Sequence, residues 1–372
     1  MPLQVLIIPD KFKGTLTACA AAEAIARGWR KARAHDSLDL LPMSDGGDGY
    51  GEVTSALLQA KSQRVKTVDA AHRPCLARWW WEPRTRTAII ESAAVIGLAM
   101  LPPKRFHPFQ LDTLGLGAVV RAAANKGATR CLMGIGGSAT NDGGFGLARG
   151  LGWQFLDRDG QLIERWTGLH RLECIRAPQR RRWFARCLVA SDVQNPLLGP
   201  RGATRVYGPQ KGLRPQDFAL AECCLGRLAL VVRQQFKRDF ARESSAGAAG
   251  GLGFGLLAFP GAQLKPGFDL FASHAALDSH LRAADLVITG EGAIDRSTLM
   301  GKGVGQIAQR CRQLKIPCIS LAGMVSASRG IAEFFAQTHA LTDLTTVQQA
   351  KAQPARWLER LAQQVARSTR EV

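Results

Sequence analysis

Short apolar segments alternate along this chain with stretches of helical periodicity. Six segments rich in apolar residues are typical of buried strands, and they lie at 3–8, 37–41, 129–135, 187–190, 286–289 and 318–321. Apolar residues at helical spacing predict helices over 18–29, 52–60, 114–126, 215–237 and 304–314, and a closing helix with Trp357, Leu358, Leu361 and Val365 on its apolar stripe. This alternation predicts an α/β fold.

One stretch departs from the alternation. Segments 63–68, 76–81 and 87–91 read as strands, and the turns between them are too short to contain helices. We therefore expect an antiparallel insertion or part of a mixed sheet. Glu91 ends the last of these strands; because an unpaired carboxylate is costly to bury, it is either exposed at the sheet edge or functional.

Polar, glycine-rich segments come just after predicted strands. In open α/β sheets ligands bind at the carboxyl ends of the strands, so these segments are candidate site loops. They lie at 10–14, 45–49, 134–144, 191–196, 208–212 and 290–295. A seventh segment, 246–255, is rich in Gly and Ala but has little polarity.

Composition narrows the classes of function. The 372 residues are enough for about two domains. Lys and Arg number 49 against 30 Asp and Glu, a net charge of +19, and 180–183 is the densest basic spot. Because the basic residues are otherwise dispersed and no recognition module accompanies them, a nucleic-acid partner ranks far behind small anionic ligands.

Membrane and disulfide classes are disfavoured as well. No apolar run reaches the ~18 residues of a membrane span, so we expect no membrane partner. The nine cysteines are scattered and contain no Cys-x-x-Cys pair, which disfavours a disulfide framework or a zinc site and predicts a cytoplasmic protein. The seven histidines show no metal-ligand spacing.

Phosphoryl transfer is the chemistry that such loops suit. It requires backbone N–H groups and cations around phosphates, carboxylates for Mg²⁺, and a base or positioning group for the acceptor. Segment 134–144 offers backbone N–H groups, two hydroxyls and an Asp ahead of a helix, although it lacks the Gly-Lys-Ser/Thr of a Walker A loop. Gly301-Lys302-Gly303 opens another helix and is a second candidate.

Simpler interpretations stay open for individual residues. The run 45–47 is compatible with a tight turn, and Asp192 and Asn195 with cap or turn positions. Lys13 and Lys211 are either solvated surface lysines or ligand contacts, and their glycine-flanked positions favour contact.

With these segments in this order, the chain resembles the bacterial glycerate kinase family, whose members phosphorylate D-glycerate with ATP. The resemblance covers nearly the whole chain, and its order and spacing are far more specific than any one glycine loop. The matching segments are Pro9–Gly14, Asp45–Gly47, Ile135–Gly144, Asp192–Leu197, Gly208–Gly212, Ala246–Gly251 and Ile288–Asp295.

The resemblance implies two α/β domains with the active site in the cleft between them. One domain is Rossmann-like and discontinuous, at 1–68 and 285–372, and the other, at 69–284, is inserted into it. ATP is the implied co-substrate, Mg²⁺ the implied metal ion and D-glycerate the implied substrate. The implied product is 2-phosphoglycerate in preference to 3-phosphoglycerate.

Chemical roles follow for the matched positions. Asp192 is the candidate base or positioning group for the acceptor hydroxyl, and Lys13 and Lys211 are candidate contacts to the substrate carboxylate or the transferring phosphate. Glu291 and Asp295 are candidate Mg²⁺ ligands. The remaining candidates are assigned to substrate or nucleotide binding, and they are Asp10, Asp45, Gly46, Gly47, Gly136, Gly137, Ser138, Thr140, Asn141, Asn195, Gln210 and Lys302.

Segment 115–118 departs from the family pattern. Residues 115–118 read Gly-Leu-Gly-Ala where the family usually has Gly-Thr-Gly-Glu, so a hydroxyl and a carboxylate are missing at Leu116 and Ala118. This departure motivates an alternative hypothesis, a catalytically weakened member that binds a nucleotide or an organic acid without turnover.

Overall fold

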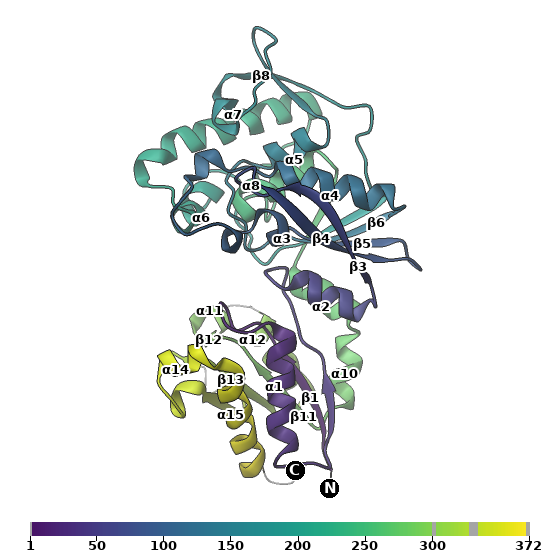
Figure 1. The fold of residues 1–372 in the computed structure, drawn as a ribbon, viewed down its shortest axis with the longest axis vertical. Helices are drawn as coiled ribbons and strands as arrows, with labels where there is room; N and C mark the ends of the chain where they lie inside the picture. Colours follow the sequence, from purple (N-terminus) through teal and green to yellow (C-terminus); the bar gives the residue numbers. More distant parts are fainter. Residues whose placement is uncertain (1, 300–302, 327–333, 370–372) are drawn as a thin grey trace. The chain divides into compact units, whose positions relative to one another are not determined.

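The computed structural model describes residues 2–299, 303–326 and 334–369 of the chain (Figure 1). The chain divides into two compact units. Unit 1 comprises residues 1–45 and 268–372, and unit 2 comprises residues 46–267. The first unit is therefore discontinuous in sequence, and the second is inserted into it.

Unit 1 is built on a wholly parallel five-stranded sheet in the order β15-β13-β11-β1-β2. Counted along the chain this is the doubly wound order 2-1-3-4-5, whose switch point lies between β1 and β11. The elements of the unit are β1 (Gln4–Pro9), α1 (Ala18–Arg30), β2 (Ser37–Leu40), α9 (Gly267–His274), α10 (Leu277–Ala283), β11 (Leu286–Gly290), β12 (Ala293–Ile294), α11 (Arg296–Leu299), α12 (Gly303–Leu314), β13 (Cys318–Ala322), β14 (Met324–Val325), β15 (Gln337–Ala340), η5 (Leu341–Asp343), α14 (Val347–Ala352) and α15 (Pro354–Ser368).

Both faces of this sheet are covered. Val5 and Ile7 of β1 belong to a buried hydrophobic cluster that includes residues of α1 and α15. Leu6 and Ile8, which the pleat places on the opposite face, are also buried. Continuous apolar runs such as 5–8 are typical of parallel strands with helices on both sides, and this accounts for the first segment of the sequence pattern.

Unit 2 contains a mixed six-stranded sheet in the order β10-β9-β6-β5-β4-β3. The strands from β10 to β5 are parallel, and β5, β4 and β3 are antiparallel, so the expected mixed sheet is confirmed. The elements are α2 (Tyr50–Leu57), β3 (Lys61–Val68), β4 (Pro74–Glu82), β5 (Thr87–Glu91), α3 (Ala93–Ile96), η1 (Leu98–Met100), η2 (Pro108–Gln110), α4 (Leu114–Asn125), β6 (Arg130–Gly134), α5 (Phe145–Gly150), β7 (Gln154–Asp157), η3 (Trp166–Arg171), β8 (Leu172–Arg176), β9 (Arg186–Ala190), α6 (Ala203–Lys211), η4 (Pro215–Asp217), α7 (Phe218–Phe236), α8 (Ala248–Ala258) and β10 (Gln263–Lys265).

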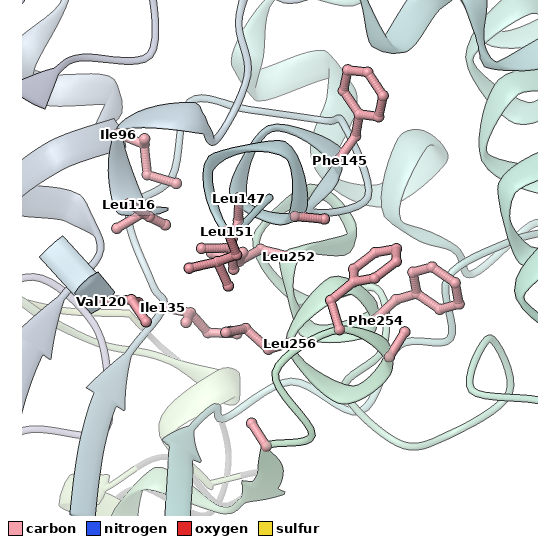
Figure 2. Packing of buried hydrophobic residues seen from close by; sticks show 14 of the residues in the cluster. Ile96, Leu116, Val120, Ile135, Phe145, Leu147, Leu151, Leu252, Phe254 and Leu256 are labelled. Carbon is pink, nitrogen blue, oxygen red and sulfur yellow. The ribbon is translucent and has the colours of Figure 1, made fainter. Parts of the chain in front are cut away.

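The core of unit 2 joins this sheet to α4, α5 and α8. Figure 2 shows Leu116 of α4, Leu147 of α5 and Leu252 of α8 in the buried cluster. Helices α4 and α5 approach closely, because a Cβ at Gly117 would lie 2.7 Å from the Cα of Gly150. Glycine at these two positions therefore sets the distance between the helices.

The units divide the chain at 45/46 and 267/268, whereas the sequence analysis placed the boundaries at 68/69 and 284/285. Strand β3 pairs with β4, and α2 packs against β4 and β5, so residues 46–68 lie with unit 2. Helix α10 packs against β1, so residues 268–284 lie with unit 1. Local sequence patterns could not show these long-range pairings.

Segment 208–212 is not a loop at a strand end, as the sequence analysis expected. It forms the last turn of α6 and the residue that ends it, Gly212, whose φ of +106° is typical of a helix C-cap. The expectation was wrong because Gly208 and Pro209 usually interrupt helices, whereas here both lie inside α6.

Candidate active site

In unit 1, acidic residues gather at the carboxyl ends of neighbouring strands. Pro9 and Gly290 pair at the ends of β1 and β11, and the backbone N–H of Asp10 donates to the carbonyl of Gly290 at 2.8 Å. Asp10 and Glu291 therefore follow adjacent strands at the switch point, the usual ligand-binding position of a doubly wound sheet. Asp45 comes from the segment after β2, the neighbour of β1 on its other side.

The electrostatics of this edge favour a bound cation. The pKa of Asp10 is raised to about 7, chiefly by burial and then by the carboxylate of Asp45. Lys11 lowers this pKa by its charge and by its backbone N–H, which donates to Oδ1 of Asp10 at 2.7 Å, and Glu291 raises it. Burial is the main cause, and the charges of Asp45 and Glu291 add to it, so negative charge is concentrated at this edge.

The other candidates of unit 1 differ in their surroundings. Glu291 is buried, and its Oε1 accepts a hydrogen bond from Oγ1 of Thr298 at 2.7 Å. The backbone N–H of Asp295 donates to the same hydroxyl at 3.3 Å, so Thr298 links the two candidate metal ligands. Lys13 is exposed on the loop after β1. Lys302 lies outside the described residues.

In unit 2, the parallel strands end in one row. Glu91, Gly134, Ala190 and Lys265 are the last residues of β5, β6, β9 and β10, and they pair across the sheet. The segment 135–144 follows β6, and Asp192 lies two residues beyond the end of β9. The strand register therefore brings the two candidate loops of unit 2 to one edge.

Glycines let the backbone segments at this edge touch. The N–H of Gly136 donates to the carbonyl of Gly46 at 3.0 Å, and a Cβ at Gly136 would lie 2.6 Å from the Cα of Gly47. A Cβ at Gly46 would lie 2.7 Å from the carbonyl oxygen of Ala190. Gly137 has a φ of +77°, in the left-handed region. The glycines at 46–47 are thus part of a three-way contact and not only of a tight turn.

Glu91 has a structural role that the sequence left undecided. Its two carboxylate oxygens accept hydrogen bonds from the backbone N–H groups of Gly49 and Gly51, each at 2.9 Å. These groups belong to the amino-terminal end of α2, where a carboxylate satisfies unpaired donors and complements the helix dipole. Glu91 therefore joins the end of β5 to the start of α2.

The polar side chains of the loop after β6 are buried. Oγ of Ser138 and Oγ1 of Thr140 lie 3.0 Å apart, and the N–H of Thr140 donates to Oγ of Ser138 at 3.1 Å. Nδ2 of Asn141 donates to Oγ1 of Thr204 at 3.1 Å. These groups shape the loop from within, which leaves backbone N–H groups as the loop's means of holding a phosphate.

Lys211 lies at the end of α6 and is buried, unlike a solvated surface lysine. Its Nζ donates to the carbonyl of Thr140 at 2.6 Å. Burial lowers the pKa of Lys211 to about 7, although the carboxylate of Asp142 acts in the opposite direction. Gly250 packs against the same carbonyl, since a Cβ there would lie 1.9 Å from the oxygen. The Thr140 carbonyl is thus held by α6 and by the Gly/Ala segment together.

Asp142 organises the far end of the same loop. Its Oδ2 accepts from the N–H and Oγ1 of Thr113 at 3.0 and 2.7 Å and from the N–H of Gly146 at 2.9 Å, and its Oδ1 accepts from the N–H of Gly144 at 3.2 Å. Burial and then the charge of Asp112 raise its pKa to about 6. Asp142 is the Asp that the sequence shows ahead of a helix in segment 134–144, and this position is a recognisable capping signal.

Asp192 and Asn195 lie in the loop after β9 with different surroundings. Asp192 is exposed, and its Oδ1 accepts a hydrogen bond from the N–H of Gly267 at 3.2 Å. Asn195 is a bridge within unit 2: its Oδ1 accepts from the hydroxyl of Tyr207 at 2.5 Å, and its Nδ2 donates to the carbonyl of Arg201 at 2.8 Å. Gln210 is exposed on α6.

Each unit thus presents polar groups at the carboxyl ends of parallel strands, an arrangement suited to binding phosphorylated ligands. The sequence profile of the Glycerate kinase family matches residues 5–370. The chain belongs to the glycerate kinase family. The match spans nearly all of both units, so every candidate residue described above lies within it.

Named relatives agree with this assignment. The chain is 35% identical to the glycerate kinase of Bacillus subtilis over 378 residues, covering 98% of this chain and 97% of that protein. It is 34% identical to the glycerate 2-kinase of Escherichia coli over 335 residues, covering 88% and 87%. A crystal structure from Salmonella typhimurium LT2, of a candidate glycerate kinase 2, matches with a TM-score of 0.83 and 32% identity over 98% of both chains.

In this member of the glycerate kinase family, residue 116 is not accessible to a ligand. Leu116 in place of the usual Thr therefore removes no ligand contact. Leu116 is fully buried in the core of unit 2 (Figure 2). We expect Leu116→Thr to lower the free energy of unfolding by about 1–3 kcal/mol, because it buries a hydroxyl and loses apolar contacts. We expect kcat/KM for D-glycerate to stay within about twofold of the wild-type value.

Urea unfolding and steady-state kinetics on the full chain test this prediction. Ala118→Glu, on the same helix but partly exposed, is the matched variant and is expected to leave stability almost unchanged. A rise of about tenfold or more in kcat/KM for Leu116→Thr would show that residue 116 contacts the ligand after all.

Proposed function

We propose that this chain transfers the γ-phosphoryl group of ATP to the 2-hydroxyl of D-glycerate, giving 2-phosphoglycerate and ADP. The observation that carries the proposal is the family match over residues 5–370. The choice of the 2-hydroxyl is supported by the Escherichia coli relative, which is a glycerate 2-kinase. The two sets of candidate residues, one in each unit, are assigned to this one reaction.

Asp192 is assigned to the acceptor hydroxyl. Its carboxylate is exposed just after β9, and one oxygen is oriented by the N–H of Gly267 at 3.2 Å. A carboxylate so placed accepts the proton of a hydroxyl as that hydroxyl attacks the phosphorus. Asn195 supports the same loop through Tyr207 and Arg201 and is assigned a positioning role.

Cationic and backbone groups are assigned to the anionic parts of the ligands. Lys211 holds the loop after β6 through the carbonyl of Thr140 and brings a positive charge to that loop. The backbone N–H groups of Gly137, Ser138 and Asn141 are assigned to phosphate oxygens, because those of Gly136, Ala139 and Thr140 donate within unit 2. The exposed Lys13 is assigned to the substrate carboxylate or to the transferring phosphate.

The carboxylates of unit 1 fit a magnesium ion that arrives with ATP. Among the residues that the structure describes, no three His, Cys, Asp or Glu side chains form a metal site by themselves. Mg²⁺ is commonly bound by one or two carboxylates together with substrate phosphates, and the charges of Asp45 and Glu291 both act on Asp10 at this edge. Glu291 and Asp295, which Thr298 links, are the proposed ligands. Bound Mg²⁺ neutralises charge on the phosphates.

We assign the reaction to the cytoplasm. All nine cysteines lie in the described residues and none forms a disulfide, in keeping with a reducing compartment. In the described part of the chain, no helix has both the length and the apolar character needed to cross a bilayer.

Identification of the product by nuclear magnetic resonance tests the proposal. The full chain is incubated with D-glycerate, ATP and Mg²⁺, and the coupling of phosphorus to the carbon-bound protons separates 2- from 3-phosphoglycerate. We expect 2-phosphoglycerate and ADP in equal amounts. Formation of 3-phosphoglycerate would overturn the regiochemistry, and binding of both ligands without turnover would overturn the enzymatic assignment in favour of a binding protein.

A further inference from the structure

A pocket lies at the edge of the unit 2 sheet opposite to the candidate loops. It has a volume of about 350 Å³, within the range of small-ligand sites. Its walls come from the β4–β5 turn at Arg86, from the end of α4 and the residues after it, 124–129, and from the segment 180–185 that precedes β9. Figure 1 labels the elements α4, β5 and β6 that bound it.

The strand register separates this pocket from the candidate active site. Arg86, Thr129 and Ala185 directly precede β5, β6 and β9. Hydrogen bonds join these three residues into a row, because the N–H of Thr129 donates to the carbonyl of Arg86 at 3.0 Å and the N–H of Ala185 donates to the carbonyl of Thr129 at 2.8 Å. The candidate loops of unit 2 follow the other ends of the same strands. Five-residue strands at about 3.3 Å per residue place the two edges about 13 Å apart.

Three guanidinium groups line the pocket. Nε of Arg86 donates to the carbonyl of Gly127 at 2.8 Å. Nε of Arg180 donates to the carbonyl of Arg182 at 3.3 Å, and Nη2 of Arg180 to the carbonyl of Trp183 at 3.4 Å. Within the described residues, no carboxylate lies within 4.0 Å of the charged groups of Arg86, Arg180 or Arg182, although acidic partners pair with many other arginines of the chain. Each guanidinium carries five N–H donors, so most of these donors remain for an anion.

The remaining walls are apolar and aromatic. Phe184 is buried, Trp183 is half-buried, and Ala124 and Ala128 contribute further apolar surface. The guanidinium of Arg180 lies over the ring of Trp183, 4.4 Å from its centroid, which holds that charge at the pocket wall. The pocket thus combines several positive charges with an apolar wall.

We propose that this pocket binds a small organic anion with two or more negatively charged oxygens, a phosphate ester or a polycarboxylate. Arginine is the side chain best matched to carboxylate and phosphate, because its planar donors form paired hydrogen bonds with both. The short basic segment 180–183, which the proposed function leaves unused, is part of this site. The proposal does not depend on the proposed function, since none of its residues belongs to the candidate active site.

Isothermal titration calorimetry on the full chain tests the proposal. Inorganic pyrophosphate and citrate are the probes, and saturating D-glycerate with a non-hydrolysable ATP analogue and Mg²⁺ occupies the catalytic site. We expect one equivalent of at least one probe to bind with a dissociation constant below about 1 mM. Pyrophosphate alone would identify a phosphate site, citrate alone a polycarboxylate site, and binding of both a site for either chemistry.

Variants of matched charge locate the binding. We expect R180Q/R182Q to weaken the affinity for the probe by about tenfold or more. The control R158Q/R242Q removes two exposed arginines elsewhere in unit 2, and we expect it to leave this affinity within about twofold of the wild-type value. Both variants are expected to keep the wild-type kcat and melting temperature. The proposal would be overturned if neither probe binds with a dissociation constant below about 5 mM, or if both variants lose affinity equally. The proposal would also be overturned if neither pyrophosphate nor citrate binds and a single-stranded oligonucleotide binds in a way that requires Arg180 and Arg182.

Discussion

Replacing Asp192 by Asn should lower kcat by about 10²- to 10⁴-fold, the range that proton transfer by a positioned side chain contributes. The amide introduced at this position would have the shape of the carboxylate, and its oxygen would still accept the hydrogen bond from the N–H of Gly267. The amide cannot accept the proton of the attacking hydroxyl. We therefore expect the fold and nucleotide binding to persist while turnover is lost.

An ADP-release assay with D-glycerate measures this loss, and calorimetry measures nucleotide affinity for the same samples. Asp159→Asn is the matched control, because it removes an exposed carboxylate of unit 2 that lies in the turn after β7 and away from the sheet edge. We expect the control to retain wild-type kcat. If kcat of Asp192→Asn stays within about threefold of wild type with an unchanged melting temperature, Asp192 is not the base.

Local sequence patterns predicted nine of the strands that the structure describes, because those strands carry short apolar or alternating runs. They did not predict the short strands β7, β8, β10, β12, β14 and β15. The segments 87–91 and 187–190 coincide with β5 and nearly with β9, and the helix expected at 114–126 is α4 within one residue. The mixed character of the unit 2 sheet was predicted for a physical reason, because turns between 68 and 87 are too short for the helical crossover that parallel strands require.

Long-range contacts could not be predicted from the same patterns. The burial of Lys211 depends on α6, which glycine and proline at 208–209 disguised as a loop. The role of Glu91 depends on the backbone of Gly49 and Gly51, some forty residues earlier in the chain. The sequence placed Glu91 at the correct strand end, but for neither residue did it contain a signal for the partners that decide whether the side chain is exposed, buried or paired.

Lys211 is predicted to control the pH dependence of the reaction. Its pKa is lowered to about 7 by burial, so its ammonium is charged below pH 7 and largely neutral above it in the free protein. Because the charged form attracts anionic ligands, kcat/KM for ATP should fall on the alkaline side with an apparent pKa near 7. Lys211→Met should lower kcat/KM by about 10²-fold or more at pH 6.5, since the charge and the hydrogen bond to Thr140 are both lost.

Lys211 also affects stability, and here the expected change with pH is opposite to that of activity: the free energy of unfolding should rise with pH where kcat/KM falls. A lysine whose pKa is lower in the folded than in the unfolded protein binds fewer protons when folded between about pH 7 and 10.5, so its contribution to the free energy of unfolding rises with pH across that interval. Below pH 7 the protein carries the cost of burying the ammonium. Lys211→Met should therefore flatten the pH dependence of stability above pH 7 while activity is lost.

Lys211→Arg and an exposed lysine separate this interpretation from a general effect of charge. Arginine remains protonated at every accessible pH, so any activity of Lys211→Arg should lack the alkaline decline near pH 7. Lys126→Met removes an exposed lysine at the end of α4 and should change neither profile. If wild-type kcat/KM is flat between pH 6 and 9, or if Lys211→Met retains the alkaline decline, the titration belongs to another group and Lys211 serves only to hold the loop at Thr140.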